Sequence, residues 1–319
     1  MFKGMKHIKL YIFRKIASRV KQKSRLQFVI INLPFAWCLL FFLLPTLLVL
    51  KISLAKCCMG LPPFSSLIQQ TDLYFYNCCI YIGNYFALLT DSFYFSVVAS
   101  SVFIAGCSTV ICLVIGYAMA YEISRAPKRL HIILILLVVL PFATSFLVRV
   151  YSWMSLLNTH GIINALLQKM HIIKLPLHLL DNNYAVCLGI VYCYLPFMVL
   201  PIYAALEKID TSYIEASFDL GASKWNSFWW ITFPLSMPGV LAGCSLVFVP
   251  ALGEFVIPEL LGGSRTMTVG QTIWCEFFNN RDWPLACAIA VFMMFSFIFY
   301  VFLSKFIKNS SSATHVDRF

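Results

Sequence analysis

The chain has 319 residues, of which 61% are hydrophobic and only 12% are charged, and its formal net charge at pH 7 is +11. A soluble domain is about 45–50% apolar and about 25% charged, so this composition excludes a disordered chain and an ordinary soluble enzyme. Nine of the 24 Lys and Arg residues lie in 1–27, before the first apolar run, which argues against nucleic-acid binding and is typical of a membrane protein.

Six apolar runs are long enough to cross about 30 Å of hydrocarbon as helices. They cover residues 28–50, 93–121, 132–156, 184–206, 239–261 and 286–307. A helix satisfies its own backbone groups in lipid, and the runs lack the alternating polarity of a membrane β-barrel. The sequence therefore predicts an all-α polytopic membrane protein with six transmembrane helices in a domain at 28–307, preceded by a basic segment 1–27 and followed by a tail 308–319.

The basic residues also predict the orientation of these helices. With the N-terminus in the cytoplasm, the inside segments carry 17 Lys and Arg residues and the outside segments carry 6. Basic loops stay on the cytoplasmic side, so both termini are expected inside the cell, although most of the excess comes from 1–27. That segment interleaves basic and apolar residues and could lie on the inner membrane surface as an amphipathic helix.

The sequence offers no catalytic or metal-binding motif. It lacks a GxxxxGK[ST] phosphate loop, an HExxH pair and a GxSxG turn, and no Cys or His cluster has zinc spacing. No catalytic residue and no metal are therefore expected. Four cysteines share one predicted external loop, where they could form disulfides or stay unpaired. They are Cys57, Cys58, Cys78 and Cys79.

The predicted cytoplasmic loop 207–238 is the most informative segment. Three polar residues can cap a short helix at its start, namely Asp210, Thr211 and Ser212. Gly221 can end that helix in the left-handed conformation. Ser223 can then cap a second short helix, which Pro234 is expected to close. Taken alone, this pattern favours an ordinary amphipathic connector over a docking surface.

The same loop resembles the EAA motif of permease subunits in binding-protein-dependent ABC importers. That motif reads Glu-Ala-Ala, three residues, Gly, nine residues and Ile-x-Leu-Pro. Five residues fall on the pattern at the same spacing, and they are Glu215, Ala216, Gly221, Ile231 and Pro234. Ser217 replaces the second alanine and Phe233 replaces the leucine. In the family this loop forms a coupling helix that docks into a groove of the ATPase subunit, so the resemblance assigns ATPase coupling to these five residues, to Ser217 and to Asp219.

Further segments are similar to the permeases of spermidine/putrescine importers, over most of 28–307. These segments are 140–153, 194–207, 249–263 and 281–286. The resemblance implies a MetI-like permease architecture in the cytoplasmic (inner) membrane of a bacterium. It also implies two ATP-binding subunits, a second homologous permease subunit and an extracytoplasmic polyamine-binding protein as partners. The chain itself is then expected to be no enzyme and to bind no cofactor, because ATP and Mg²⁺ would be used by the partner ATPase.

Arg149 and Glu254 are the ionisable residues deepest in the predicted spans. A charge there costs at least about 2.5–3.5 kcal/mol unless it is paired or faces water. At about 1.5 Å per residue, both lie about 22–26 Å from the cytoplasmic ends of their helices, so an intramembrane ion pair between them is one expectation. The alternative is that Glu254 lines the substrate pathway and attracts the ammonium groups of a polyamine.

Aromatic faces near such a carboxylate would also attract ammonium groups. The candidates are Tyr151, Trp153, Tyr192, Tyr194 and Trp274, each of which also fits ordinary packing or an interfacial belt. Three acids near the predicted outer mouth could instead contact the binding protein, namely Glu259, Glu276 and Asp282. The sequence leaves other functions open: a permease for another small solute, a stand-alone channel or secondary transporter, and a scaffold that transports nothing.

Overall fold

The computed structural model describes residues 30, 32–58, 60, 62–65, 68–72, 75–78, 80–263 and 266–298. The chain divides into two units. One comprises Met1–Ile82 and Ala290–Phe319, and the other comprises Gly83–Ile289. The second unit contains every residue proposed above for coupling or for the substrate pathway.

An apolar helix of 22 residues, Asn32–Ser53, occupies most of the first predicted span. It is followed by the strands β1 (Ile68–Asp72) and β2 (Phe75–Cys78), which pair antiparallel with Ile68 opposite Cys78. The all-α prediction missed this hairpin, because its residues are too few and too polar to stand out among long apolar runs. The side chains of 66–79 lie outside the description, so the choice between disulfides and free thiols in this loop stays a prediction.

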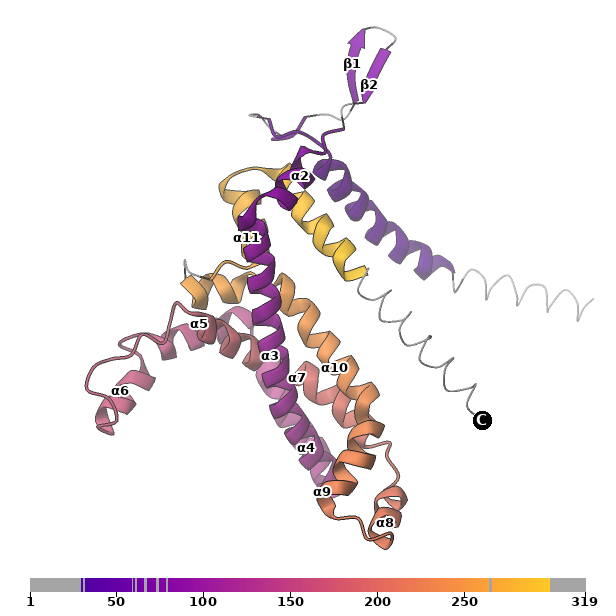
Figure 1. Cartoon of the computed structure of the whole chain (residues 1–319), viewed down its shortest axis with the longest axis vertical. Coiled ribbons are helices and arrows are strands. Elements are labelled where there is room, and N and C mark those ends of the chain that lie inside the picture. The colour runs from indigo at the N-terminus through magenta and orange to yellow at the C-terminus, as the bar shows by residue number, and fades with distance from the viewer. Residues whose placement is uncertain are drawn as a thin grey trace, which may run out of the picture. The chain divides into compact units, whose positions relative to one another are not determined.

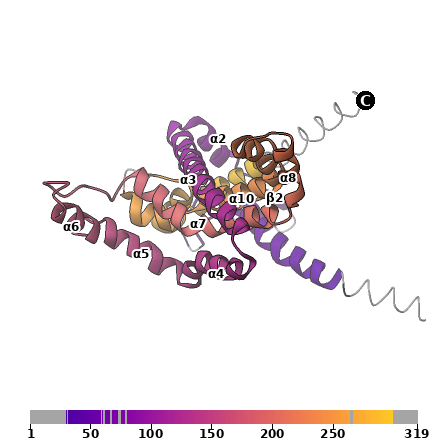
Figure 2. The ribbon, with the colours of Figure 1, turned by 90° about the horizontal axis from the view of Figure 1, so that it is seen from below.

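Three long helices form the bundle of the second unit: α3 (Ser92–Arg125), α7 (Asn183–Leu206) and α10 (Phe233–Gly253). Figures 1 and 2 show them side by side. Each is apolar around its whole circumference, as expected where one face meets lipid and the other meets a helix. The Asp91 carboxylate accepts a hydrogen bond from the first turn of α3, and Asn182 caps α7 in the same way.

Small residues allow α7 and α10 to approach closely. A Cβ atom at Gly239 of α10 would lie 2.5 Å from the Cβ atom of Ala205 and 2.7 Å from the carbonyl oxygen of Pro201. Membrane helices gain van der Waals packing through such contacts, because lipid supplies no hydrophobic force between them. The close packing of α7 against α10 therefore depends on glycine at position 239, where any side chain would collide with α7.

We expect Gly239→Val to destabilise the detergent-purified protein by about 1–3 kcal/mol, because the added atoms must push the two backbones apart. Gly106 of α3 supplies the control, since nothing lies within 4 Å of the position that its Cβ would occupy. Thermal unfolding should give a lower Tm for Gly239→Val than for Gly106→Val. Equal Tm values would contradict this account of the interface.

The third predicted span, 132–156, is divided rather than continuous. Helix α4 (Lys128–Val139) passes into the 3₁₀ turn η1 (Leu140–Ala143), and α5 (Phe146–Leu157) follows after a bend of 85°. Pro141 removes a backbone donor, and Thr144 is extended with ψ 157, so the helix cannot run through. Figure 1 shows α5 and α6 (Ile162–Lys169) projecting from the side of the bundle.

The fifth predicted span, 239–261, is also interrupted. Helix α10 ends at Gly253, and Glu254 is extended with φ −68 and ψ 131 before a π turn, η3 (Pro258–Gly262). Pro258 offers no N–H to the Glu254 carbonyl, and its ring would press against that carbonyl in a continuous helix. Glu254 therefore lies at a break in the helix and not inside it.

The described residues contain four helices that are long and apolar enough to cross a membrane, and the bent pair would make a fifth. The sixth predicted span corresponds to the helix Trp283–Ile298, with 299–307 outside the description. Before it come α11 (Val269–Trp274) and the π turn η5 (Cys275–Asn279). The count of six crossings stays a prediction.

Candidate functional site

The loop between α7 and α10 begins with a well-capped helix, α8 (Thr211–Asp219). Asp210 is the capping residue, and its carboxylate accepts a hydrogen bond of 3.0 Å from the backbone N–H of Ser212. That bond, with a second one from the Ser212 hydroxyl, places the pKa of the Asp210 carboxyl below its ordinary value. The prediction of a helix starting at Asp210, Thr211 or Ser212 is confirmed.

Gly221 ends α8, as the sequence predicts. Its φ of +81 lies in the left-handed region, and its N–H donates to the carbonyl of Phe218 at 2.9 Å. The N–H of Ala222 reaches the carbonyl of Ser217, also at 2.9 Å. These two bonds make a Schellman motif, which satisfies carbonyls that the end of a helix leaves free.

The second helix, α9 (Lys224–Ser227), starts at the predicted cap, where the Ser223 hydroxyl accepts from the N–H of Asn226 at 3.3 Å. The prediction that Pro234 closes this helix is wrong. A π turn, η2 (Phe228–Thr232), carries the helix into α10, and Phe233 N–H donates to the carbonyl of Phe228. The wider π turn lets Pro234 enter the first turn of α10, where its missing N–H costs little.

Ser217, which departs from the family pattern, joins the two short helices. Its hydroxyl is hydrogen-bonded to the Ser227 hydroxyl at 2.8 Å, and both side chains are buried. The same hydroxyl is also 2.7 Å from the carbonyl of Ile214 in α8. A serine at this position therefore fixes α8 against α9 by a side-chain contact that alanine would lack.

We expect Ser217→Ala to destabilise the α8–α9 pair by about 1–3 kcal/mol, because it leaves the buried Ser227 hydroxyl without its partner. Replacing both serines with alanine should cost less than the single change, since no unsatisfied group then remains. Hydrogen exchange of the α8 amides in the purified protein measures both effects. Faster exchange in the double variant than in Ser217→Ala would contradict this role.

Helices α8 and α9 and the turn that follows them expose both charged and large apolar side chains. Glu215, Ala216 and Asp219 are exposed, whereas Ile231 is half-buried. Around them lie exposed aromatic and aliphatic side chains, with Leu220 at 89% and Trp230 at 82% exposure; Tyr213, Phe218 and Trp225 belong to the same set. Large exposed apolar side chains concentrated in one loop are typical of a protein or membrane contact. Figure 1 shows α8 and α9 together at one end of the bundle.

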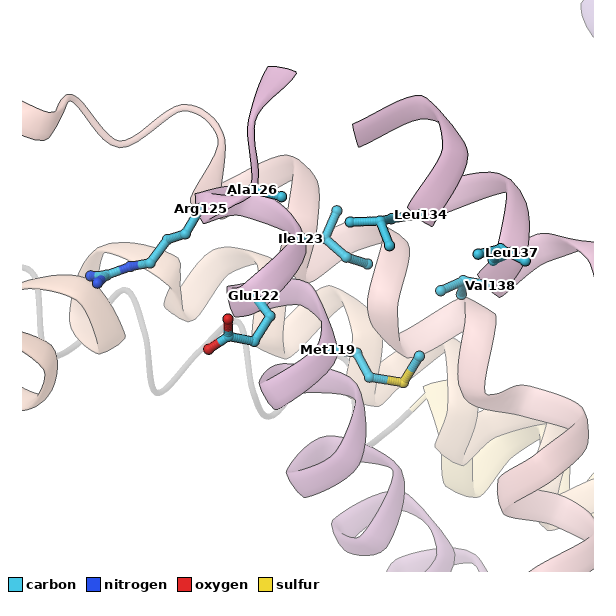
Figure 3. Close-up of a pocket in the computed structure, with 8 residues that line it drawn as sticks. All are labelled: Met119, Glu122, Ile123, Arg125, Ala126, Leu134, Leu137 and Val138. Carbon is cyan, nitrogen blue, oxygen red and sulfur yellow. The ribbon is translucent and has the colours of Figure 1, made fainter. Parts of the chain in front are cut away.

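Two of the hollows at this end of the bundle are lined by the end of α3. One, of about 490 Å³, lies between the ends of α3 and α7 and the inner side of α8, and Glu215, Arg125 and Thr232 are among its lining residues. The other, of about 570 Å³, lies between α3 and α4 (Figure 3). There Met119 and Ile123 face the apolar side chains of α4, and the charged ends of Glu122 and Arg125 point away from them. Neither hollow is evident from the sequence, because each is formed by residues of separate helices.

The second group of predicted site residues gathers at the break after α10. The Tyr194 hydroxyl donates to Glu254 Oε2 at 2.6 Å, and the Val256 N–H donates to Oε1 at 3.0 Å. The hydroxyl of Thr268 donates to the Glu254 carbonyl at 3.3 Å. Tyr194 and Val256 therefore orient the two oxygens of the Glu254 carboxylate. Tyr194 positions this carboxylate through its hydroxyl, and does not act only as an aromatic face for an ammonium group.

The alternative pairing of Glu254 with Arg149 is not formed in the described residues. Arg149 is 6% exposed, and its guanidinium lies over the rings of Phe142 and Phe146 at 5.2 and 5.8 Å. Residue counting predicts the same depth for both groups, but the third span bends by 85° before α5 and the fifth breaks at Glu254. Those two features turn the side chains toward different partners.

The remaining aromatic candidates divide into separate contacts. Trp153 and Tyr192 meet edge to face, with ring centroids 5.4 Å apart. Trp274 stacks on Phe255, the residue after Glu254, at 4.8 Å and an interplanar angle of 10°. Tyr151 is half exposed. Glu254, Tyr194 and the Phe255–Trp274 stack therefore form one neighbourhood, and the sequence analysis missed Phe255 because nothing in its spacing distinguishes it.

Comparison with known proteins identifies the family. The model described as "binding-protein-dependent transport system inner membrane component" matches residues 112–309, which include the α8–α9 loop and Glu254. The spermidine/putrescine transport system permease protein PotB of Haemophilus influenzae is 38% identical over 268 residues, covering 84% of this chain and 89% of that protein. PotB of Escherichia coli is 36% identical over 255 residues, covering 80% and 88%.

A solved structure confirms the fold. The crystal structure of a bacterial ABC transporter involved in the import of the acidic polysaccharide alginate includes a chain that aligns with a TM-score of 0.68 and 16% identity. The alignment covers 92% of this chain and 99% of that one, so the helical architecture is shared throughout. The chain therefore belongs to the binding-protein-dependent transport system inner membrane component family, the membrane permeases of bacterial ABC importers.

Proposed function

We propose that this permease translocates polyamines inward across the cytoplasmic membrane. The observation that carries the proposal is the 38% identity to a spermidine/putrescine permease over nine-tenths of that protein's length. The chemistry of the Glu254 neighbourhood supports it. A carboxylate held beside an aromatic stack suits a flexible chain of ammonium groups, which bind both to anions and to ring faces.

The exposed surface of α8 and α9 is the part that we propose docks with an ATPase. Two copies of an ATP-binding subunit would supply ATP and Mg²⁺ chemistry, while this chain contributes no ATPase site of its own. A second permease chain would complete the membrane channel, and an extracytoplasmic binding protein would deliver the polyamine. The charge bias of the loops supports cytoplasmic placement of the α8–α9 surface and of both termini.

Within the proposed pathway, Glu254 is the group that contacts substrate, and Tyr194 and Val256 hold its two oxygens. Trp274 contributes a ring face through its stack on Phe255. Trp153, Tyr192 and Tyr151 are further candidates for ring faces that contact substrate. Motion at α8 and α9 would reach this region only if their contacts with the ATPase differ between two states.

The experiment that tests the proposal is purification of the chain with the products of its neighbouring genes, followed by reconstitution in lipid vesicles. We expect an ATP-binding subunit in the complex, and ATP hydrolysis that rises when the binding protein carries spermidine or putrescine. A panel of labelled solutes, including sulfate and iron complexes, separates a polyamine importer from one for another solute. Uptake without ATP would instead identify a channel or secondary transporter.

A further inference from the structure

The hollow between the inner side of α8 and the ends of α3 and α7 has a mixed lining. Its volume of about 490 Å³ lies within the range of about 300–1,000 Å³ that is usual for small-molecule sites. Apolar side chains of α7 and α8 form part of the wall. Three of the polar lining residues come from three different elements: Arg125 of α3, Glu215 of α8 and Thr232 of η2. The hollow therefore combines a positive group, a negative group and a hydroxyl.

The guanidinium of Arg125 has a defined position beside this hollow. Its Cζ atom lies 4.2 Å from the ring centroid of Tyr121, which also lines the hollow. The Tyr121 ring is itself held edge to face by Phe228 of η2, with the ring centroids 5.5 Å apart. Figure 3 shows the Arg125 side chain pointing away from the apolar residues of α4. A stacked guanidinium keeps its N–H donors free, and no hydrogen bond to them is formed within the described chain.

Glu215 supplies the opposite charge from α8. Its side chain is exposed, and among the described residues it forms no ion pair with Arg125 or with any other cation. The Ser217–Ser227 hydrogen bond holds α8 against α9, so the backbone that carries Glu215 is fixed. Two opposite charges thus line one hollow without neutralising each other. A ligand with an anionic group and an ammonium group can bind to both.

Thr232 is an independent indication that a polar ligand belongs here. It is 3% exposed, and its Oγ1 atom has no hydrogen-bond partner among the described residues. In a regular helix a threonine hydroxyl can donate to the carbonyl four residues earlier. That carbonyl, of Phe228, instead accepts the N–H of Phe233 across the π turn. A buried hydroxyl without a partner is costly, and a polar ligand atom in the hollow would satisfy it.

We propose that this hollow binds a small zwitterion, whose phosphate or carboxylate pairs with Arg125 and whose ammonium group pairs with Glu215. Charge-assisted hydrogen bonds of this kind are stronger than neutral ones, and a guanidinium can bind two anionic oxygens at once. The head group of phosphatidylethanolamine and a free amino acid share this chemistry. Arg125 is the last residue of a helix long enough to cross a membrane, so both the lipid surface and the aqueous phase adjoin this end of the bundle.

The bound zwitterion would also restrain the coupling loop. It connects α8 to the end of α3 across a space that the protein leaves empty, and it occupies the carboxylate that α8 exposes. This consequence, unlike binding itself, rests on the proposed function, in which α8 docks with an ATPase. A ligand that favours one position of α8 opposes movement to another. At a concentration of ten times its Kd, the zwitterion should therefore lower ATP-coupled uptake about tenfold.

The test uses the complete importer in nanodiscs of phosphatidylglycerol, a lipid without an ammonium group. O-Phosphoethanolamine and glycine are titrated by calorimetry, beside ethanolamine and inorganic phosphate, which each carry one sign of charge. We expect at least one zwitterion to bind about tenfold more tightly than either single-charge probe. Arg125→Gln should weaken that binding about tenfold. Arg129→Gln removes an exposed cation that does not line the hollow, and should leave binding unchanged.

Two further measurements complete the test. Thr232→Val keeps the shape of the side chain and removes the unpartnered hydroxyl, so zwitterion binding should weaken about threefold while the Tm stays at the wild-type value or rises. In nanodiscs that contain phosphatidylethanolamine, native mass spectrometry shows whether wild type retains this lipid and Arg125→Gln loses it. That result identifies the lipid as the source, whereas tighter binding of glycine than of O-phosphoethanolamine identifies an amino acid.

Zwitterions that bind no more tightly than the single-charge probes, or equally well to wild type and Arg125→Gln, would overturn the inference. If Arg125→Gln does not assemble, Thr232→Val decides, and wild-type affinity in that variant counts against the site. Undiminished uptake at saturating zwitterion refutes the restraint on α8. A complex that binds the zwitterion as expected but takes up no polyamine refutes the proposed function and leaves the binding site in place.

Discussion

Replacing Gly221 with valine should reduce ATP-coupled uptake by about tenfold or more while leaving the protein in the membrane. Gly221 has a φ of +81, which costs an L-residue about 1–2 kcal/mol and a β-branched residue more. To escape that cost, valine must break the bonds to the carbonyls of Phe218 and Ser217. Helix α8 would then lose its fixed angle to α9, and the surface that carries Glu215 would no longer match its partner. Uptake in vesicles, normalised to inserted permease, measures the effect.

The matched control is Gly221→Asn, because asparagine adopts the left-handed region more readily than other residues. It should keep most of the uptake. Nothing lies within 4 Å of the position of a Cβ at Gly221, so steric conflict does not distinguish the two variants. Equal uptake in the valine and asparagine variants would show that the turn at Gly221 has no role in coupling.

Replacing Glu254 with glutamine should lower polyamine uptake about tenfold or more, with normal assembly and normal basal ATP hydrolysis. The amide oxygen can still accept from Tyr194 or Val256, so the local structure survives. What is lost is the negative charge, and a charge-assisted hydrogen bond is about twice as strong as a neutral one. Initial rates of spermidine uptake at saturating binding protein measure the loss.

Glu122→Gln removes an acid from the far end of α3, outside the proposed pathway, and should leave uptake unchanged. A second informative change is Tyr194→Phe, which keeps the ring but releases one oxygen of Glu254. It should reduce uptake less than Glu254→Gln. If Glu254→Gln transports at the wild-type rate, the carboxylate does not contact substrate.

Local features of the coupling loop were predictable because they depend on a few adjacent residues. A polar cap before a helix and a glycine after it are specified by backbone sterics and nearby hydrogen bonds, so Asp210, Ser223 and Gly221 were identified correctly. The prediction for Pro234 was wrong because it considered the proline alone and not the conformation of the turn before it. A proline normally ends a helix, but a π turn immediately before it changes which carbonyl it faces.

Tertiary contacts were less accessible from the sequence. Counting residues gives depth along a helix, yet it gives neither the direction in which a side chain points nor the positions of breaks. Glu254 therefore binds Tyr194 and not Arg149, and the third predicted span bends by 85° at Thr144 and Ser145. Those breaks are visible only in the structure.

The π turn η2 has a mechanical consequence. Because it prevents Pro234 from breaking the chain, Lys224–Gly253 is one helix of 30 residues, about 45 Å long at 1.5 Å per residue. One end carries the residues of α9, which we propose dock with an ATPase, and the other ends beside Glu254. A tilt of about 10° at the α9 end would displace the far end of this helix by about 8 Å. Under the proposed function, movement of a docked ATPase would reach the neighbourhood of Glu254 along this single helix.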